Sequence, residues 1–267
     1  MEEYIKTNRE LWQKLTGVNA SSAYYRLAQF KQGENALHEL EMGEVGSVDG
    51  KSLLHLQCHF GMDTLSWARL GADATGVDFS PKAIDLARSL SEELKIPAKF
   101  ICCDLYDLPN QLQGQFDVVF TSYGVLTWLH DIPRWAQLAA SYVKPGGIFY
   151  IVEFHPFAQV FSDTDTEYWI KYPYFHNAPF IGEVDASYTG DEVKFAPNET
   201  FEWNHPLGEV VSALVEAGLQ IEFLHEFPYS VYQQLPNLYE TTDRKFVFHE
   251  KEPLFPLMYS IRAKKDG

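Results

Sequence analysis

A short loop and one acid carry the residue types and the spacing best suited to binding a small polar ligand. The loop, 57–61, ends an apolar run that begins at Ser52, and Asp78 ends a second apolar run 17 residues after Gly61. In a βαβ unit such a loop presents backbone N–H groups at a helix N-terminus, where an anionic group is favoured. An acid at the end of the second strand accepts the hydroxyls of a ribose. Together these residues predict a nucleoside-binding site.

The loop departs from the dinucleotide fingerprint G-x-G-x-x-G. Gln57 and His59 occupy positions at which that motif has glycine, while Gly61 remains. A pyrophosphate needs close approach to the backbone, whereas a single carboxylate needs less. The loop therefore favours a nucleoside that bears a carboxylate over NAD, and an NAD-dependent oxidoreductase stays as an alternative.

Apolar runs around these residues predict the strands that position them. They are Ser52–Gln57, Ala74–Asp78, Ala98–Cys102, Phe116–Thr121 and Ile148–Glu153. Each is apolar through most of its length, as in a parallel sheet that is covered on both faces. Helical patterns fall between them, and the one over 131–143 is stopped by Pro145-Gly-Gly147, which turns the chain into the next strand. This alternation predicts a doubly wound α/β fold, and two last runs, 219–227 and 256–263, predict an antiparallel hairpin at its edge.

Two segments do not follow this alternation of strands and helices. Residues 1–50 have the pattern of a helical arm with aromatic side chains, and residues 154–204 are rich in Phe, Tyr and Trp and interrupted by prolines. So aromatic a segment packs on the core or over a pocket. We therefore expect a single domain over 1–267, in which 1–50 form an arm or lid and 154–204 form an insertion over the substrate site.

Charge and cysteine content narrow the classes of partner. Lys and Arg number 21 against 37 acids, so the net charge is −16, which repels nucleic acid and anionic lipid. No run approaches the ~18 to 20 apolar residues of a membrane span, and the N-terminus has no signal-peptide pattern. We expect a cytoplasmic protein with neither nucleic-acid nor membrane partners. Cys58 and the adjacent Cys102 and Cys103 form no CxxC pair, and neighbouring strand residues face opposite sides, so we expect no metal.

Five segments, in their order along the chain, resemble the motifs of class I S-adenosylmethionine-dependent methyltransferases. They are Leu54–Gly61, Thr75–Ser80, Cys103–Pro109, Phe116–Phe120 and Val143–Gly147. The resemblance covers about residues 50–153 and implies the Rossmann-like fold of that family, a mostly parallel seven-stranded sheet with a terminal antiparallel hairpin. It also implies S-adenosylmethionine as the cofactor. The HLQCHFG and EWNHPLGE segments are similar to a bacterial subgroup whose substrates are unassigned.

Carried over residue by residue, the resemblance places the methionine end of the cofactor at the loop and at the end of the fourth strand. The residues expected there are Gln57, Cys58, His59 and Gly61, with Thr121, Ser122 and Tyr123 lining the sulfonium end. His55, Gln57 and His59 depart from the family, which usually has an acid at the first of these positions and glycine at the other two.

The same resemblance places the adenosine at the second and third strands. Asp78 would hold the ribose diol, with Phe79 beside the adenine. Asp104 would accept from the adenine amino group, and Leu105 would cover the face of the ring.

Methyl transfer to an oxygen or a nitrogen needs an acceptor that is held in line, kept dry and relieved of its proton. Histidine is the natural base near neutral pH. The candidate bases at the carboxyl edge of the predicted sheet are His130, His155, His205 and Glu153. We expect an enzyme that transfers a methyl group from S-adenosylmethionine to a small molecule. A second alternative is a protein that binds this cofactor without chemistry.

Overall fold

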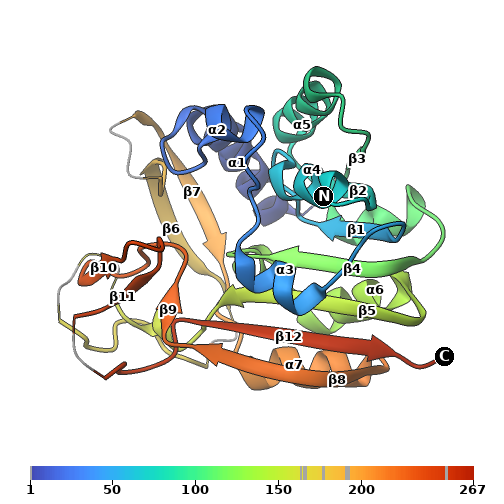
Figure 1. Cartoon of the computed structure of the whole chain (residues 1–267). Coiled ribbons are helices and arrows are strands. Elements are labelled where there is room, and N and C mark those ends of the chain that lie inside the picture. The colour runs from blue at the N-terminus through green and yellow to red at the C-terminus, as the bar shows by residue number, and fades with distance from the viewer. Residues whose placement is uncertain (1, 163, 165–166, 176–177, 190–192, 250–251) are drawn as a thin grey trace.

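A seven-stranded sheet runs through the molecule and carries the site at one edge (Figure 1). The computed structural model describes residues 2–267 apart from 163, 165–166, 176–177, 190–192 and 250–251. The strands of the sheet, ordered β3-β2-β1-β4-β5-β12-β8, are β1 (Ser52–Leu56), β2 (Asp73–Asp78), β3 (Lys99–Cys102), β4 (Phe116–Ser122), β5 (Val143–Phe154), β8 (Leu219–Phe227) and β12 (Met258–Lys265). β1 to β5 pair in parallel, and β12 runs antiparallel to β5 and β8. The predicted fold class is confirmed.

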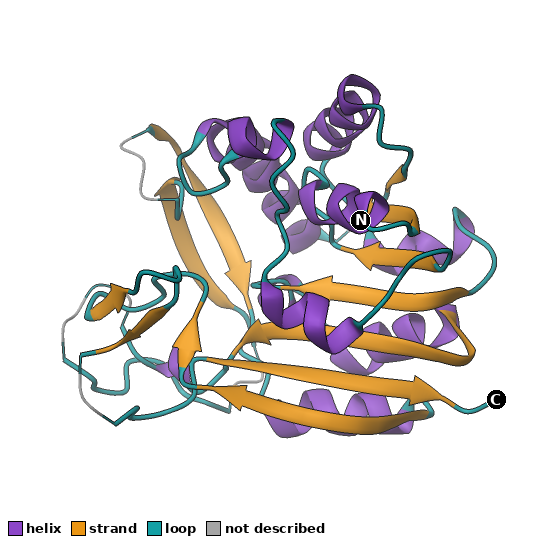
Figure 2. Ribbon diagram, viewed as in Figure 1, coloured by secondary structure: helices purple, strands orange, loops and turns teal. Residues whose placement is uncertain are grey.

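Helices cover both faces of this sheet (Figure 2). The α-helices are α1 (Glu3–Ser21), α2 (Leu27–Lys31), α3 (Glu39–Val45), α4 (Met62–Arg69), α5 (Pro81–Leu94), α6 (Ile132–Tyr142) and α7 (Leu207–Glu216), and the short 3-10 helices are η1 (Leu105–Asn110), η2 (Leu126–Trp128) and η3 (Ala158–Val160). α6 and α7 pack on one face, and α3, α4 and α5 on the other. Within the described ranges, no helix has the length and apolar content needed to cross a membrane.

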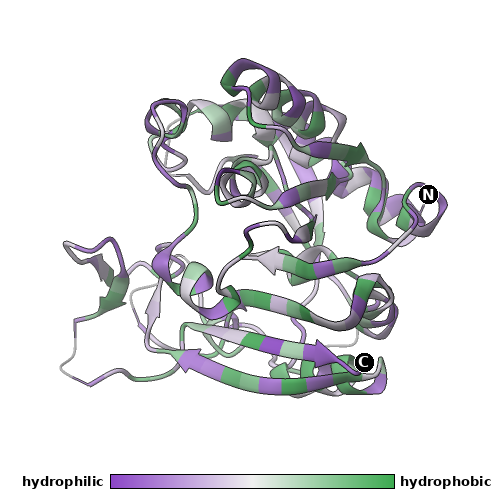
Figure 3. Cartoon of the chain, turned by 45° about the vertical axis from the view of Figure 1, so that its right-hand side comes forward, coloured by the Kyte–Doolittle hydropathy of each residue, from purple (hydrophilic) through white to green (hydrophobic). Residues whose placement is uncertain are grey.

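Successive side chains of a strand point to opposite faces of the sheet and belong to two separate hydrophobic clusters. In β1, Leu54 and Leu56 pack with α6 and α7, while Leu53 packs on the opposite face. In β5, Phe149 belongs to the first cluster and Tyr150 to the second. Because both faces are buried, the strands are nearly continuous apolar runs. Figure 3 shows this as green along the central strands.

The arm and the insertion lie together at the carboxyl edge of the sheet. In Figure 1 the arrowheads of β1, β4 and β5 point to the left, where a hairpin of β6 (Phe180–Ala186) and β7 (Lys194–Glu202) stands beside α1. A three-stranded sheet of β9 (Tyr229–Ser230), β10 (Leu238–Glu240) and β11 (Phe246–Phe248) lies at the same edge. The sequence predicts no strand between the runs 219–227 and 256–263, because strands this short show no period.

β5 begins earlier than predicted. The Pro145-Gly-Gly147 segment was expected to turn the chain into a strand at Ile148, yet the strand starts at Val143. The pairing with β4 shifts register inside this segment, from Phe116 opposite Val143 to Val118 opposite Ile148. The glycines therefore form an irregularity within an extended strand instead of a turn before it, as glycines in strands often do.

The order of the strands sets the place of the site. β1 lies between β2 and β4, so the crossovers on its two sides leave in opposite directions. In open α/β sheets a crevice forms at such a switch point, outside the carboxyl ends of the strands. The loops after β1 and β4 meet there.

Candidate functional site

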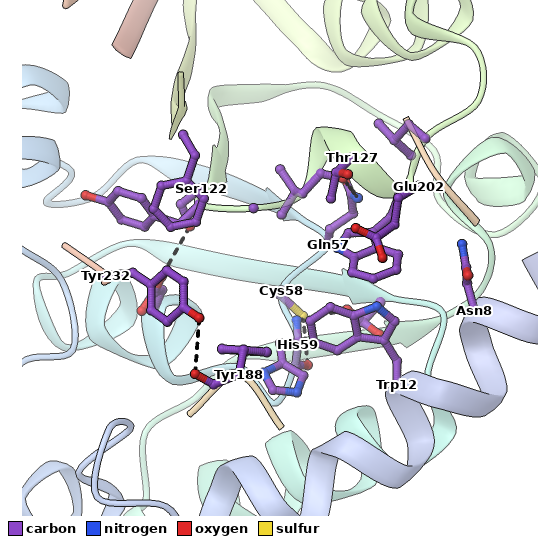
Figure 4. Close-up of a pocket in the computed structure, with 18 of the residues that line it drawn as sticks. Asn8, Trp12, Gln57, Cys58, His59, Ser122, Thr127, Tyr188, Glu202 and Tyr232 are labelled. Carbon is purple, nitrogen blue, oxygen red and sulfur yellow. Dashed lines mark hydrogen bonds between the residues drawn. The ribbon is translucent and has the colours of Figure 1, made fainter. Parts of the chain in front are cut away.

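A cavity of about 810 Å³ lies at this switch point, at the upper end of the ~300 to 1,000 Å³ range of ligand pockets. The ends of β1, β2, β3 and β4 form its floor, and α1, the β6–β7 hairpin and the segment after β9 form its cover. All the cofactor residues expected from the sequence line it except Thr121; they are Gln57, Cys58, His59, Gly61, Asp78, Phe79, Asp104, Leu105, Ser122 and Tyr123. Figure 4 shows several of these with side chains from the cover.

The loop has the left-handed backbone conformation typical of glycine, although Gly61 is the one glycine among residues 57–61. Gln57 and His59 have φ angles of 56° and 50°, and Gly61 has a φ of 79°, all in the left-handed region that costs a residue with a side chain about 1–2 kcal/mol. Gly61 also has no room for a side chain, because a Cβ there would lie 2.7 Å from a ring carbon of Phe100. In this conformation the loop's own N–H groups are donated inside the protein, that of Cys58 to the carbonyl of Val77 at 2.8 Å and that of Gly61 to the carbonyl of Cys58 at 2.9 Å.

Asp78 holds this loop in place. Its carboxylate accepts hydrogen bonds from the backbone N–H of His59 at 2.9 Å and from that of Ser80 at 2.8 Å. Burial raises its pKa to about 7, while these bonds oppose the rise. Each carboxylate oxygen has a second lone pair, so Asp78 can restrain the loop and still accept hydroxyl groups of a ligand.

Two side chains of the loop carry polar atoms without partners. Gln57 donates from Nε2 to the carbonyl of Val125 at 3.0 Å, and its buried Oε1 has no hydrogen bond in the described structure. The Nε2 of His59 is also buried and without a partner, and burial lowers the pKa of His59 to about 3, so the ring is neutral. A buried polar atom without a partner is costly. A ligand that donates to Gln57 would remove that cost.

His55 and Cys58 belong to the structural support of the loop. His55 bonds through Nδ1 to the hydroxyl of Thr64 at 2.9 Å and packs on Phe120, and burial lowers its pKa to about 3. Cys58 is buried, its N–H donates to the carbonyl of Val77 at 2.8 Å, and burial raises the pKa of its thiol. Both residues therefore stay neutral beneath the ligand cavity.

Asp104 and Leu105 stand where the sequence places the adenine. Asp104 caps η1 by accepting from the N–H of Tyr106 at 2.9 Å, and burial raises its pKa. Leu105 is buried, and Phe79 lines the same part of the cavity wall. An acid beside two apolar side chains suits a planar ring with an exocyclic amino group.

The end of β4 sends two of its three predicted residues into the cavity. Ser122 donates to Asp63 at 3.3 Å, and Tyr123 donates its hydroxyl to Glu41 at 2.8 Å. Thr121 lies outside the cavity lining, because it is fully buried and its hydroxyl donates to the carbonyl of Leu56 at 3.3 Å. Adjacent residues of a strand face opposite sides, so the assignment of Thr121 to the sulfonium end is corrected.

Three of the four candidate bases lie away from the cavity. Glu153 is buried and accepts from the backbone N–H groups of 124–126 and of Phe154, so it anchors the loop after β4. His155 bonds to Glu226 at 3.0 Å and His205 to the carbonyl of Leu129 at 2.8 Å.

None of these three lines the large cavity, and we correct their placement as bases: each is already bonded to other groups of the protein. His130 does line the cavity, with its ring 4.8 Å from that of Tyr4 and 4.9 Å from that of Tyr106. It is the one of the four candidates that lines the cavity.

Several lining residues are not singled out by the sequence. Asp63, in the first turn of α4, lines the cavity, and burial raises its pKa to about 6. Trp12 of α1 lies 5.1 Å from the ring of His59 and 5.4 Å from that of Trp128. The position of Asp63 directly after the loop is a local signal that could have marked it. Trp12 has no such signal, because its contacts are all remote in sequence.

Comparisons with known proteins concern the segment that carries this site and the fold. Residues 53–147 match the family model described as a methyltransferase domain. An uncharacterized methyltransferase of Synechocystis sp. is 35% identical over 129 residues, which cover 46% of this chain and 56% of that protein. The ubiquinone biosynthesis O-methyltransferase of Bordetella avium is 28% identical over 128 residues, which cover 47% of this chain and 53% of that protein. The chain thus spans about half the length of these curated relatives.

Solved structures extend the likeness over the whole fold. An S-adenosylmethionine-dependent methyltransferase from Clostridium acetobutylicum matches with a TM-score of 0.57 over 97% of both chains at 15% sequence identity. At that identity the match concerns the fold, while the family match concerns the segment that holds the loop, Asp78 and Asp104. Residues 53–147 therefore match a methyltransferase domain, within a chain whose fold is like that of solved S-adenosylmethionine-dependent methyltransferases.

Proposed function

We propose that this protein transfers a methyl group from S-adenosylmethionine to a small molecule. The observation that carries the proposal is one continuous cavity that includes both the residues expected to hold the cofactor and the aromatic cover of α1 and the β6–β7 hairpin. A cavity of this volume has room for a second ligand beside a nucleoside. A protein that only stored the cofactor would have no use for the additional space.

The residues present fit the cofactor. The unpartnered Oε1 of Gln57 would accept from the methionine ammonium group, and the carboxylate of Asp78 from the ribose hydroxyls. Phe79 and Leu105 would pack on the adenine, and Asp104 would accept from its amino group. When bound, S-adenosylmethionine supplies an electrophilic methyl group on a sulfonium.

The protein's own contribution is to position the acceptor, exclude water and manage a proton. The cover of α1 and the hairpin shields the cavity, which strengthens the electrostatic interactions inside it. An in-line displacement gains most of its rate from orientation. For an acceptor that must lose a proton, His130 and Asp63 are ionisable groups on the cavity wall that can take it.

A small acceptor is favoured by the enclosure and by charge. The cavity is partly covered by α1 and the β6–β7 hairpin, and the net charge of −16 opposes binding to nucleic acid. The Bordetella avium relative is named for methyl transfer in ubiquinone biosynthesis, which is consistent with a small acceptor for this chain too.

Calorimetric titration with S-adenosylhomocysteine tests the proposal. We expect saturable binding of one molecule per chain, and no comparable binding of NADH, whose pyrophosphate would meet the side chains of Gln57 and His59. Absence of binding at millimolar S-adenosylhomocysteine would overturn the methyltransferase assignment. Binding of NADH with displacement of S-adenosylhomocysteine would favour an oxidoreductase.

A further inference from the structure

Three tyrosines from three distant segments form a corner on the cavity wall. Tyr24 follows α1, Tyr188 follows β6 and Tyr232 follows β9. Their ring centroids are 6.3 Å apart for Tyr24 and Tyr188, 6.0 Å for Tyr24 and Tyr232, and 5.9 Å for Tyr188 and Tyr232. The three planes meet at 81°, 88° and 90°. We call these three residues the tyrosine corner.

The rings line a space as well as packing together. All three line the cavity of about 810 Å³, and Tyr188 keeps 38% of its surface exposed although it is surrounded by other residues of the cover. In Figure 4 Tyr232 lies on the side of the cavity opposite Asn8, while Tyr188 lies near Trp12, whose ring centroid is 6.3 Å away. A cluster that served only to fill a core would bury these surfaces. The corner is therefore available to a ligand.

Hydrogen bonds fix the corner before any ligand arrives. The amide of Asn19 donates to the Tyr188 hydroxyl at 3.1 Å, and the hydroxyls of Tyr25 and Tyr188 are bonded to each other. The Tyr232 hydroxyl donates to the backbone carbonyl of Tyr188 at 3.2 Å. Rings held in this way lose little entropy on binding.

The charges around the corner favour a cation. Burial is the main cause that raises the pKa of Tyr24 and Tyr25; among nearby charges, Asp63 raises both pKa values further, while Arg244 lowers that of Tyr24. The described residues that line the cavity include six acids (Glu34, Asp63, Asp78, Asp104, Glu183 and Glu202) and two arginines (Arg26 and Arg244). Arg26 is paired with Glu34 at 2.9 Å. Burial raises the pKa of Tyr24 and Tyr188, so the rings themselves stay neutral.

A cation fits the geometry of three perpendicular rings. Three rings at right angles with these separations can face one common point about 4 Å from each centroid, within the ~6 Å over which a cation is attracted to an aromatic face. Three such faces beside one carboxylate form the kind of cage that recognises alkylammonium groups. We propose that the methyl acceptor is a small amine, and that the tyrosine corner and Asp63 hold its nitrogen as an ammonium ion. This inference rests on the proposed function and names its substrate class.

Charge balance agrees with such a site. The lone pair of the neutral amine forms the new N–C bond while the S–C bond breaks, and the electron pair of that bond stays on sulfur. The positive charge thereby passes from sulfur to nitrogen, so the corner binds the methylated product as a cation. An acceptor that enters protonated gives its proton to the Asp63 carboxylate, and Asp63 returns it to solvent after release.

The corner is built from parts of the chain outside the segment that carries the expected cofactor residues. The three tyrosines lie outside residues 53–147, the segment that matches the methyltransferase family. They belong to the arm, the insertion and the segment between β8 and β12. These are the parts of the chain in which a substrate preference can change without altering the cofactor loop.

Two probes of equal shape test the inference: choline, and 3,3-dimethylbutan-1-ol, in which carbon replaces the charged nitrogen. Each is titrated by calorimetry into the full-length protein that has first been saturated with S-adenosylhomocysteine. We expect choline to bind at least tenfold more tightly than the alcohol. Equal affinities would overturn the amine assignment while leaving the cofactor binding intact. Competition between choline and S-adenosylhomocysteine would overturn it too, because the corner would then be the cofactor's own cation site.

Two variants of Tyr232 distinguish the contribution of its aromatic ring from that of its hydroxyl group. Tyr232→Leu should abolish the preference for choline and Tyr232→Phe should keep it, with S-adenosylhomocysteine affinity unchanged in both. Tyr188→Leu serves as the second variant if Tyr232→Leu does not bind S-adenosylhomocysteine. A preference for choline that survives the loss of the ring would contradict the role of the corner. If the unmodified protein does not bind S-adenosylhomocysteine, the proposed function fails and this inference fails with it.

Discussion

The side chain of Asn8 pairs with the backbone of Phe201 as a neighbouring strand would. Its Nδ2 donates to the Phe201 carbonyl at 2.7 Å, and its Oδ1 accepts from the Phe201 N–H at 3.0 Å. Asn8 is 2% exposed, so both bonds are shielded from water. They join α1 to the edge of β7, and further along α1 Asn19 accepts from the hydroxyl of Ser187 at 2.6 Å. Helix and hairpin therefore form one cover over the cavity.

Replacing Asn8 should loosen this cover. Asn8→Ala leaves a buried N–H and a buried carbonyl of Phe201 without partners, at a cost of about 1–3 kcal/mol. We expect faster amide exchange in α1 and β7, measured by hydrogen–deuterium exchange mass spectrometry, with no change in β4 or β5. Asn110→Ala, at an exposed site, is the matched control. Unchanged exchange in β7 would show that the apolar contacts alone hold the hairpin.

Loss of the Asp78 carboxylate should weaken cofactor binding. Asp78→Asn keeps the shape but replaces one acceptor with a donor facing an N–H, so we expect S-adenosylhomocysteine affinity to fall by at least about 1.5 kcal/mol. Calorimetry measures the change. Asp73→Asn, at the exposed start of the same strand, should bind as the unmodified protein does. An unaltered affinity in Asp78→Asn would place the ribose elsewhere.

A side chain at position 61 should destabilise the fold. Gly61→Ala combines a left-handed φ with a Cβ 2.7 Å from Phe100 and 2.8 Å from Ala87, so strain and overpacking together should cost at least about 2 kcal/mol. Urea unfolding followed by tryptophan fluorescence measures this cost. Gly33→Ala has a φ of 110° with open space around the new Cβ, and should lose less. Equal losses in the two variants would mean that the close contact relaxes without cost.

Glu41 should make stability depend on pH. Burial raises the pKa of Glu41 to about 8 from an ordinary 4.5, so the folded protein holds a proton that the unfolded chain releases. The binding of this proton stabilises the folded state fully below about pH 4.5, and this stabilisation is lost as the pH rises towards 8.

Glu41→Gln should therefore narrow the difference between unfolding free energies at pH 5 and pH 8 by more than about 1 kcal/mol. Urea denaturation at the two pH values measures it. The exposed Glu39, in the first turn of the same helix, gives the control Glu39→Gln, which should keep the original difference. Parallel pH profiles for Glu41→Gln and the unmodified protein would count against a buried proton at Glu41.

The sequence predicts the sheet well because buried parallel strands are apolar throughout. The end of β2 at Asp78 and the start of β4 at Phe116 are found where they were expected. The predicted start of β5 is wrong. Pro145-Gly-Gly147 has the composition of a turn, but in the structure this segment lies inside a strand because β4 pairs on both sides of it. Local composition cannot express the register of a neighbouring strand.

The candidate site also has a part that the sequence predicts and a part that it does not. The loop and Asp78 are recognisable because a single βαβ unit fixes their geometry. Glu153 and His155 share the correct edge of the sheet, yet Glu153 is bonded to backbone N–H groups and His155 to Glu226. Tyr24 and Tyr188 meet only through the packing of the arm on the hairpin. Contacts across such distances in the chain leave no periodic signal in the sequence.

The left-handed backbone at His59 makes the conformation of the loop depend on Asp78. The bond from the His59 N–H to Asp78 supports a conformation that only glycine adopts without strain. Loss of the acid alone would remove both the support and a ligand contact, whereas a return to glycine at 59 would make the support unnecessary. The acid at position 78 therefore has two separate uses in this protein, and only one of them depends on the side chain at position 59.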